Sequence, residues 1–174
     1  MFLKNYTSNT PVSKTIHDIE QVLIRCGVSG ITKEYGPDAE ITALQFHIRI
    51  QPNSPPVSIR LPADRESALQ ALWLDYADGE QLSTDGKKII GYGSRKRLTR
   101  ASFAGQAERT AWRIMKDWVE VQMSMIQMRQ ADFAEVFMAY VWNGRETFYQ
   151  RIKGNGYRAL LTEGTKDETN SSTS

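Results

Sequence analysis

The chain has 174 residues, 40% of them hydrophobic, and a formal net charge of +2. These values are typical of one globular domain with a hydrophobic core, and the single cysteine excludes a disulfide framework. The first residues lack the apolar run of a signal peptide, and no stretch reaches the roughly 18 apolar residues of a membrane span. We therefore expect a soluble, cytoplasmic protein without a membrane partner.

The first part of the chain predicts a helix followed by a strand. Pro11 suits the first position of a helix, and Gly27 predicts its end. Residues 28–35 then predict a strand that ends in a Gly-Pro-Asp-Ala turn. The apolar residues of the helix fall on one face, and they are Val12, Ile16, Ile19, Leu23 and Cys26.

Two further strands are predicted by alternation of apolar and polar residues. The apolar face comprises Leu44, Phe46, Ile48, Ile50, Val57, Ile59 and Leu61. The polar face comprises Gln45, His47, Arg49, Ser58 and Arg60, with Thr32 and Glu34 on the neighbouring strand. We infer an antiparallel meander with one face covered by helices.

Asp64 predicts the start of a second helix that continues to about Tyr76, because aspartate is a favoured capping residue. The expected buried side of this helix comprises Ala68, Leu69, Leu72, Trp73 and Tyr76. From Ala77 to Ser102 the apolar pattern lapses and glycines occur among polar residues. A connection this long without regular structure is uncommon in a compact domain, so we expect a flexible, functional loop at about residues 78–102.

The longest predicted helix spans about residues 104–130. Its apolar seam follows alternating spacings of four and three, and comprises Ala107, Ala111, Ile114, Trp118, Val121, Met125 and Met128. A flanking apolar row comprises Trp112, Met115, Val119 and Ile126, whereas the side expected in solvent comprises Arg109, Arg113, Lys116, Glu120 and Gln127. So wide an apolar face must pack against a sheet or other helices, and we expect Trp118→Ala to cost roughly 3–5 kcal/mol.

The remaining residues predict a short helix after Asp132, a tight turn at Asn143-Gly144, and then either a hairpin strand or another helix. Residues 163–174 are polar and rich in serine and threonine, so we expect a disordered tail. The predicted fold is therefore a single α+β domain over residues 1–162. Helices, including the long one, cover one face of a three- to four-stranded antiparallel meander.

The sharpest functional feature is a group of eight cations between Gly86 and Arg113, with Glu108 as the single acid. Cations on a loop can contact phosphates, and an interleaved aromatic residue can stack on an unpaired base. The alternative is a solvated basic loop that maintains solubility. The residues of this segment that we expect at nucleic acid are Lys87, Lys88, Tyr92, Arg95, Lys96, Arg97 and Arg100.

The polar face of the sheet is a second candidate. His47, Arg49 and Arg60 lie on adjacent predicted strands, where they could follow a phosphate backbone. If the basic loop lies over this face, the two features form one groove. The alternative is an ordinary solvent-exposed sheet face.

No catalytic residue, metal site or cofactor is predicted. His17, His47 and Cys26 show no metal-ligand spacing, and no nucleotide-binding or nucleophile motif occurs. Restriction-endonuclease-like nucleases also begin with a helix, a three-stranded meander and a second helix. Glu20 and Asp38 fit two of the carboxylate positions of those nucleases. The third strand has Ser-Ile-Arg at residues 58–60 in place of Glu-x-Lys, so a metal-binding carboxylate is missing. A degenerate nuclease is therefore the least favoured alternative.

Several stretches of the chain resemble one known family. They are residues 10–20, residues 33–35 together with the following strand that contains Phe46, and residues 59–62. The most telling stretch runs from residue 108 through residue 118 to Phe137. Together they resemble a widespread family of small phage- and prophage-encoded proteins of unknown function. The likeness covers about residues 6–161 and brings no assigned activity or catalytic residue. It implies a phage context, where replication, recombination and evasion of host defence are common tasks.

Two functions stay open. The first is a non-catalytic nucleic-acid-binding protein that prefers single-stranded DNA and supports recombination or annealing, because the element order is broadly similar to the core of some single-strand annealing proteins. The second is a protein-binding module, either an inhibitor of a host factor or defence protein or a homo-oligomer subunit. Aromatic residues and methionines indicate it, namely Met123, Met125, Met128, Phe133, Phe137, Met138, Tyr140 and Trp142.

Overall fold

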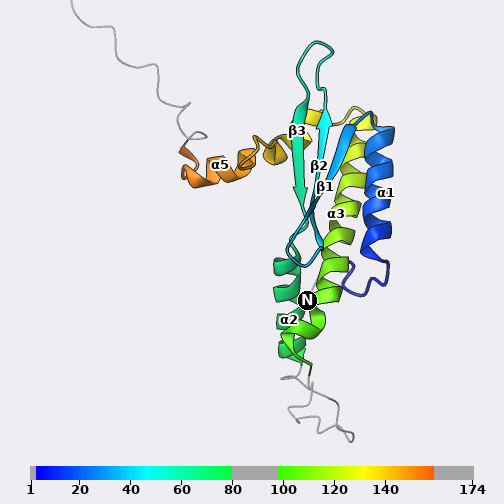
Figure 1. Ribbon diagram of the computed structural model, residues 1–174, viewed down its shortest axis with the longest axis vertical. Helices are drawn as coiled ribbons and strands as arrows, with labels where there is room; N and C mark the ends of the chain where they lie inside the picture. Colours follow the sequence, from blue (N-terminus) through cyan, green and yellow to red (C-terminus); the bar gives the residue numbers. More distant parts are fainter. Residues whose placement is uncertain (1–2, 80–97, 159–174) are drawn as a thin grey trace, which may run out of the picture.

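In the computed structural model, residues 3–79 and 98–158 are described (Figure 1). They contain a three-stranded antiparallel sheet in the order β1-β2-β3, with helices packed beside it, so the predicted α+β fold is confirmed. The elements are α1 (Val12–Arg25), β1 (Ser29–Tyr35), β2 (Ile41–Ile48), β3 (Val57–Pro62), α2 (Arg65–Gly79), η1 (Arg100–Phe103), α3 (Ala104–Gln127), α4 (Phe133–Phe137), η2 (Met138–Tyr140) and α5 (Phe148–Gly154).

The apolar face of the sheet is the centre of the core. Cross-strand pairs join Leu44 to Leu61 and Phe46 to Ile59, and all four side chains are buried. The predicted alternation is therefore confirmed for these residues. It is wrong for Ile50, which is 41% exposed, because β2 ends at Ile48 before the proline-containing turn.

Helices α1 and α3 lie side by side against this face (Figure 1). Helix α1 buries Ile16, Ile19 and Leu23, as its apolar spacing predicts. It ends at Arg25, and Gly27 follows with a φ of +80°. Glycine has no Cβ to clash in that conformation, which explains why the chain turns into β1 at this point.

Helix α3 has the predicted length but turns a different face to the core. Trp112 and Val119 of the predicted flanking row are buried, and so is Met123, which belongs to neither predicted row. Val121 and Met128 belong to the predicted seam, yet they are 55% and 60% exposed. The prediction was wrong for these residues because two adjacent stripes are apolar, and helical spacing alone does not say which stripe meets the sheet.

Lys116 shows how this rotation places a cation in the interior. The sequence predicts Lys116 in solvent, but its side chain is buried and its ammonium group donates to the Glu120 carboxylate one turn later. The aliphatic stem of lysine can cover apolar surface while its charged end finds a partner. At the other end of the predicted seam, Ala107 and Ala111 are buried against α2, as the apolar spacing requires.

The C-terminal elements close one end of the core. Phe137 lies edge-on to Phe46 at 5.9 Å and to Trp118 at 5.4 Å between ring centroids. Val141 then pairs with Ile59 in a single antiparallel bridge at the free edge of β3. The sequence left open whether a hairpin strand or a helix follows the turn at Asn143-Gly144, and the structure contains a short bridge and then a helix. Trp142 bridges to Thr147 across the tight turn, and α5 follows and extends away from the sheet (Figure 1).

The predicted loop at residues 78–102 is shorter at both ends. Helix α2 continues to Gly79, and η1 begins at Arg100 and leads directly into α3. Residues 80–97 lie outside the described part of the chain, as does the predicted tail at residues 163–174.

Candidate nucleic-acid interface

Most of the predicted basic segment lies outside the described residues. This applies to Lys87, Lys88, Tyr92, Arg95, Lys96 and Arg97. The residues that flank the segment are described, and they bring its two ends together. The backbone N–H of Leu98 donates to the hydroxyl of Tyr76 on α2 at 3.3 Å. Both ends of the basic segment are thus held at one end of the molecule, where α2 ends and η1 begins (Figure 1).

Arg100 is the one predicted cation of the 87–100 set that is described. Its guanidinium group donates to the carboxylate of Glu66 and, at 3.4 Å, to the amide oxygen of Gln70, both on α2. Its positive charge is therefore balanced within the chain. Arg100 fixes η1 to α2 and contributes less free positive charge than the sequence predicts.

Three aromatic side chains gather beside the ends of the basic segment. Ring centroids lie 5.3 Å apart for Tyr76 and Phe103, 5.8 Å for Trp73 and Tyr76, and 6.3 Å for Trp73 and Phe103. All three side chains are partly exposed. Sequence reasoning placed Trp73 and Tyr76 on a buried helical side and missed this cluster. The spacing of three residues between Trp73 and Tyr76 is the signal that the sequence offers for it, whereas the contact with Phe103 depends on tertiary packing.

The polar face of the sheet contains an ordered row of side chains, one from each strand. The guanidinium group of Arg60 on β3 donates to both carboxylate oxygens of Glu34 on β1, at 2.9 Å from Nε to Oε1 and 2.7 Å from Nη2 to Oε2. Gln45, on β2 between them, donates to the same carboxylate. At the edge, the Arg60 guanidinium carbon lies 5.0 Å from the centre of the Trp142 ring. Arg60 is thus engaged on two sides.

The Glu34 carboxylate has a lowered pKa, chiefly because Arg60 donates hydrogen bonds to its charged form; partial burial opposes this effect, and Gln45 adds to it. In this row the positive charge of Arg60 is therefore paired with the negative charge of Glu34. A phosphate that approached Arg60 would compete with Glu34, so Arg60 is a weaker phosphate ligand than its sequence position predicts.

His47 and Arg49 differ from Arg60 because they are exposed. His47 lies opposite Gly30, where a Cβ would stand 3.2 Å from its ring carbon Cδ2. Arg49 makes one long hydrogen bond, 3.5 Å from Nη1 to the Pro52 carbonyl. Arg49 therefore keeps more of its charge available than Arg60 does.

The structure does not bring the two predicted basic regions together in the described residues. Arg49 lies in the β2–β3 turn at one end of the long axis, whereas Gly79 and Leu98, which flank the basic segment, lie toward the other end (Figure 1). The single groove expected from the sequence depends on the course of residues 80–97, which lie outside the described residues, so it stays a prediction. We therefore treat the two regions as separate candidates.

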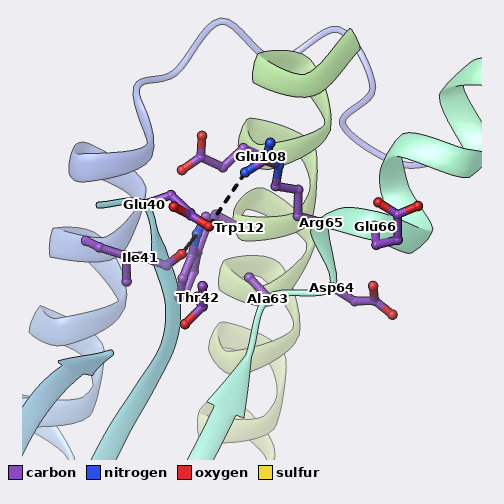
Figure 2. A pocket seen from close by; sticks show the side chains of 9 residues that line it. All are labelled: Glu40, Ile41, Thr42, Ala63, Asp64, Arg65, Glu66, Glu108 and Trp112. Carbon is purple, nitrogen blue, oxygen red and sulfur yellow. Dashed lines mark hydrogen bonds and ion pairs between the residues drawn. The ribbon is translucent and has the colours of Figure 1, made fainter. Parts of the chain in front are cut away.

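A pocket of about 330 Å³ opens where β2 begins, β3 ends and α2 meets α3 (Figure 2). The carboxylates around it belong to Glu40, Asp64, Glu66 and Glu108, and Arg65 is the single cation in its lining. Arg65 lies 3.9 Å from Glu40. An excess of negative charge repels phosphates, so this pocket is not part of a nucleic-acid interface.

The carboxylates considered for a nuclease do not converge. Glu20 pairs with Lys33 at 2.9 Å on the helix-covered side of the sheet, and Asp38 is exposed in the turn after β1. Arg60 lies on the opposite face with Glu34. In the part of the chain that the structure describes, no group of three or more His, Cys, Asp or Glu residues could hold a metal ion.

Half of the residues that indicated a protein-binding module pack in the core of the molecule. Met123 and Phe137 are fully buried, and Phe133 and Tyr140 pack against the same core. Met128 and Met138 are the exposed members, at 60% and 49%. Core packing therefore explains Met123, Phe133, Phe137 and Tyr140.

Comparisons with protein-family models, with curated proteins and with solved structures give no match for this chain. The resemblance to small phage-encoded proteins therefore stays a prediction from the sequence. Across residues 3–79 and 98–158, no helix is both long and apolar enough to span a membrane.

Proposed function

We propose that this chain binds single-stranded nucleic acid, with DNA as the first choice, and does so without catalysis. The observation that carries the proposal is the convergence of Tyr76 and Leu98, which holds both ends of the basic segment together beside an aromatic cluster. Five cations lie between residues 80 and 97, against two acids, Glu80 and Asp85. Positive charge for phosphates and aromatic rings for bases are the two components of single-strand recognition.

In this proposal the cations Lys87, Lys88, Arg95, Lys96 and Arg97 neutralise phosphates, and Tyr92 stacks on a base. Arg100 is a lesser contributor because Glu66 already balances its charge. Arg49 is the more available cation of the sheet face, whereas Arg60 is held by Glu34. Support of phage recombination or annealing is the context in which we propose that the protein acts.

The test is fluorescence anisotropy with labelled single-stranded and double-stranded DNA of equal length, titrated over a range of salt concentrations. Removal of three phosphate contacts by Arg95→Ala, Lys96→Ala and Arg97→Ala together should reduce the slope of log affinity against log salt by roughly two for a single strand. Comparison of the unfolding transition of this variant with that of the parent protein separates a loss of binding from a loss of folding.

The matched control removes three exposed cations elsewhere, as Arg25→Ala, Arg145→Ala and Lys153→Ala together. It has the same net charge as the segment variant, so it measures the effect of overall charge alone. An equal loss of affinity in both variants would remove the basic segment from the interface. No binding of the parent protein at low salt would remove the proposed function.

A further inference from the structure

The distal half of the predicted α3 seam is apolar and open. Val121 and Met128 are 55% and 60% exposed, and Ile114 and Met125 on the same side of the helix are partly exposed. These residues continue the four-and-three spacing that begins at Ala107. We refer to Ile114, Val121, Met125 and Met128 as the distal strip. Such spacing is typical of a helix that packs along its length against another helix.

Among the described residues, helix α2 packs against the first half of this seam only. Ala107 and Ala111 pack in one cluster with Ala68, Leu69 and Leu72 of α2. Helix α2 lies beside the N-terminal half of α3, and the C-terminal half continues past it (Figure 1). The distal strip is therefore the continuation of an established helix–helix interface beyond the end of its intramolecular partner.

Asp117, which borders the strip on α3, is already paired. Asp117 receives the ammonium group of Lys4 at 2.7 Å and lies 3.8 Å from Arg113. An apolar strip beside an internally paired carboxylate fits another apolar helix better than a phosphate backbone.

We propose that the distal strip is a homodimer interface, in which the α3 helices of two copies pack antiparallel about Val121. A twofold axis at Val121 places Ile114 opposite Met128 of the second copy. It also places the bulky Trp118, which is partly exposed, opposite the small and exposed Ser124. Ile114 thus meets a flexible residue and Trp118 a small one, so neither pair is too bulky to pack.

The size of the strip sets the expected strength of the dimer. Residues 114–128 cover about 21 Å of helix at 1.5 Å per residue. An interface of this length buries less than the roughly 1,200–2,000 Å² of stable complexes, so the dimer should be reversible with micromolar or weaker affinity. This inference is independent of nucleic-acid binding.

The first test is sedimentation velocity of the full chain from about 1 µM to about 500 µM, the range in which such an equilibrium shifts. The parent protein should change from monomer toward dimer. Val121→Glu should remain monomeric throughout, because it places two carboxylates together at the twofold axis. Ile24→Glu is the matched control, since Ile24 is also 55% exposed and helical but lies on α1. It should dimerise like the parent. A parent protein that stays monomeric at every concentration overturns the proposal, as does an Ile24→Glu variant that is equally impaired.

Cysteine pairing tests the arrangement without relying on a charged substitution. In a Cys26→Ser background, Val121→Cys should form an intermolecular disulfide on mild oxidation, because the two residues face each other at the axis. Met128→Cys alone should not, whereas Met128→Cys mixed with Ile114→Cys should form a heterodimer. Self-linking of Met128→Cys with none from Val121→Cys would overturn the antiparallel arrangement.

Discussion

The two faces of the β-sheet are built from the same alternating strands, but different interactions determine the positions of their side chains. On the helix-covered face, Phe46 and Ile59 are paired across strands and buried, and packing alone explains their positions. On the polar face, Glu34, Gln45 and Arg60 form a hydrogen-bonded row that depends on which residues the register places opposite each other. Alternation assigns a residue to a face, whereas register decides its partner.

The largest expected effect is on the covered face. Trp112→Ala should lower the free energy of unfolding by about 3–5 kcal/mol, because it removes a fully buried side chain and leaves the Ile41 carbonyl without its indole donor at 3.1 Å. Denaturant unfolding measures this change. Trp118→Ala should cost less, since Trp118 is only partly buried.

Trp142→Ala is the control on the polar face, where the ring lies at the sheet edge over Arg60. Its expected cost is about 1 kcal/mol, the scale of an exposed cation–π contact. A cost equal to that of Trp112→Ala would show that the polar face is a second core, and the contrast between the faces would be lost.

The second expected effect concerns the row of Glu34, Gln45 and Arg60 on the polar face of the sheet. A double-mutant cycle with Arg60→Ala and Glu34→Gln should give a coupling energy of about 1 kcal/mol, because the pair is bidentate but partly exposed to solvent. The same cycle on Lys14 and Asp18, an exposed pair at 3.6 Å, should give a coupling energy close to zero. Equal coupling in both cycles would mean that the row contributes no more than a surface ion pair.

The fold was largely predictable from the sequence, and the reason is the strength of particular patterns. Strict alternation in β2 and β3 assigned Leu44, Phe46, Ile59 and Leu61 to the core, since a strand has only two faces. Helix α3 was assigned to the correct length but not to the correct face. Trp112 and Val121 both lie on apolar stripes, and only the tertiary packing of sheet and α1 selects the one that contains Trp112.

The candidate interface was less predictable, because it depends on contacts between residues far apart in the sequence. The pairing of Arg60 with Glu34 spans 26 positions, and that of Arg100 with Glu66 spans 34. Neither partner can be chosen from local spacing. The predicted cations were therefore counted as free charges, although Arg60 and Arg100 are each paired with a carboxylate within the chain.

The third expected effect is a pH dependence that sharpens the comparison between the faces. The lowered pKa of Glu34 means that its charged form is stabilised by folding. This contribution is present above the pKa of the unfolded chain, about 4.3, and is lost as pH falls through the lower pKa of the folded state. The stability advantage of the parent protein over Glu34→Gln should therefore shrink below about pH 4. Thermal unfolding between pH 3 and pH 7 measures it, and an advantage that grows toward low pH would contradict the assigned direction.

The smallest expected effect lies on α3, away from both faces of the sheet. Asp117 loses hydration through burial, which alone would raise its pKa, but hydrogen bonds from Lys4 and Asn5 outweigh this and lower it. Asp117→Ala should therefore release residues 3–8 from α3, at a cost of about 0.5–1 kcal/mol for one partly exposed charged group. Gln106 also donates to the Tyr6 and Ser8 carbonyls, at 2.8 and 3.1 Å, so the comparison with Gln106→Ala decides which contact matters. Faster amide hydrogen exchange at residues 4–8 in Asp117→Ala alone would assign the attachment to the charge. Faster exchange in Gln106→Ala alone would assign it to the backbone contacts, and the charge network would then serve only to neutralise the border of the distal strip.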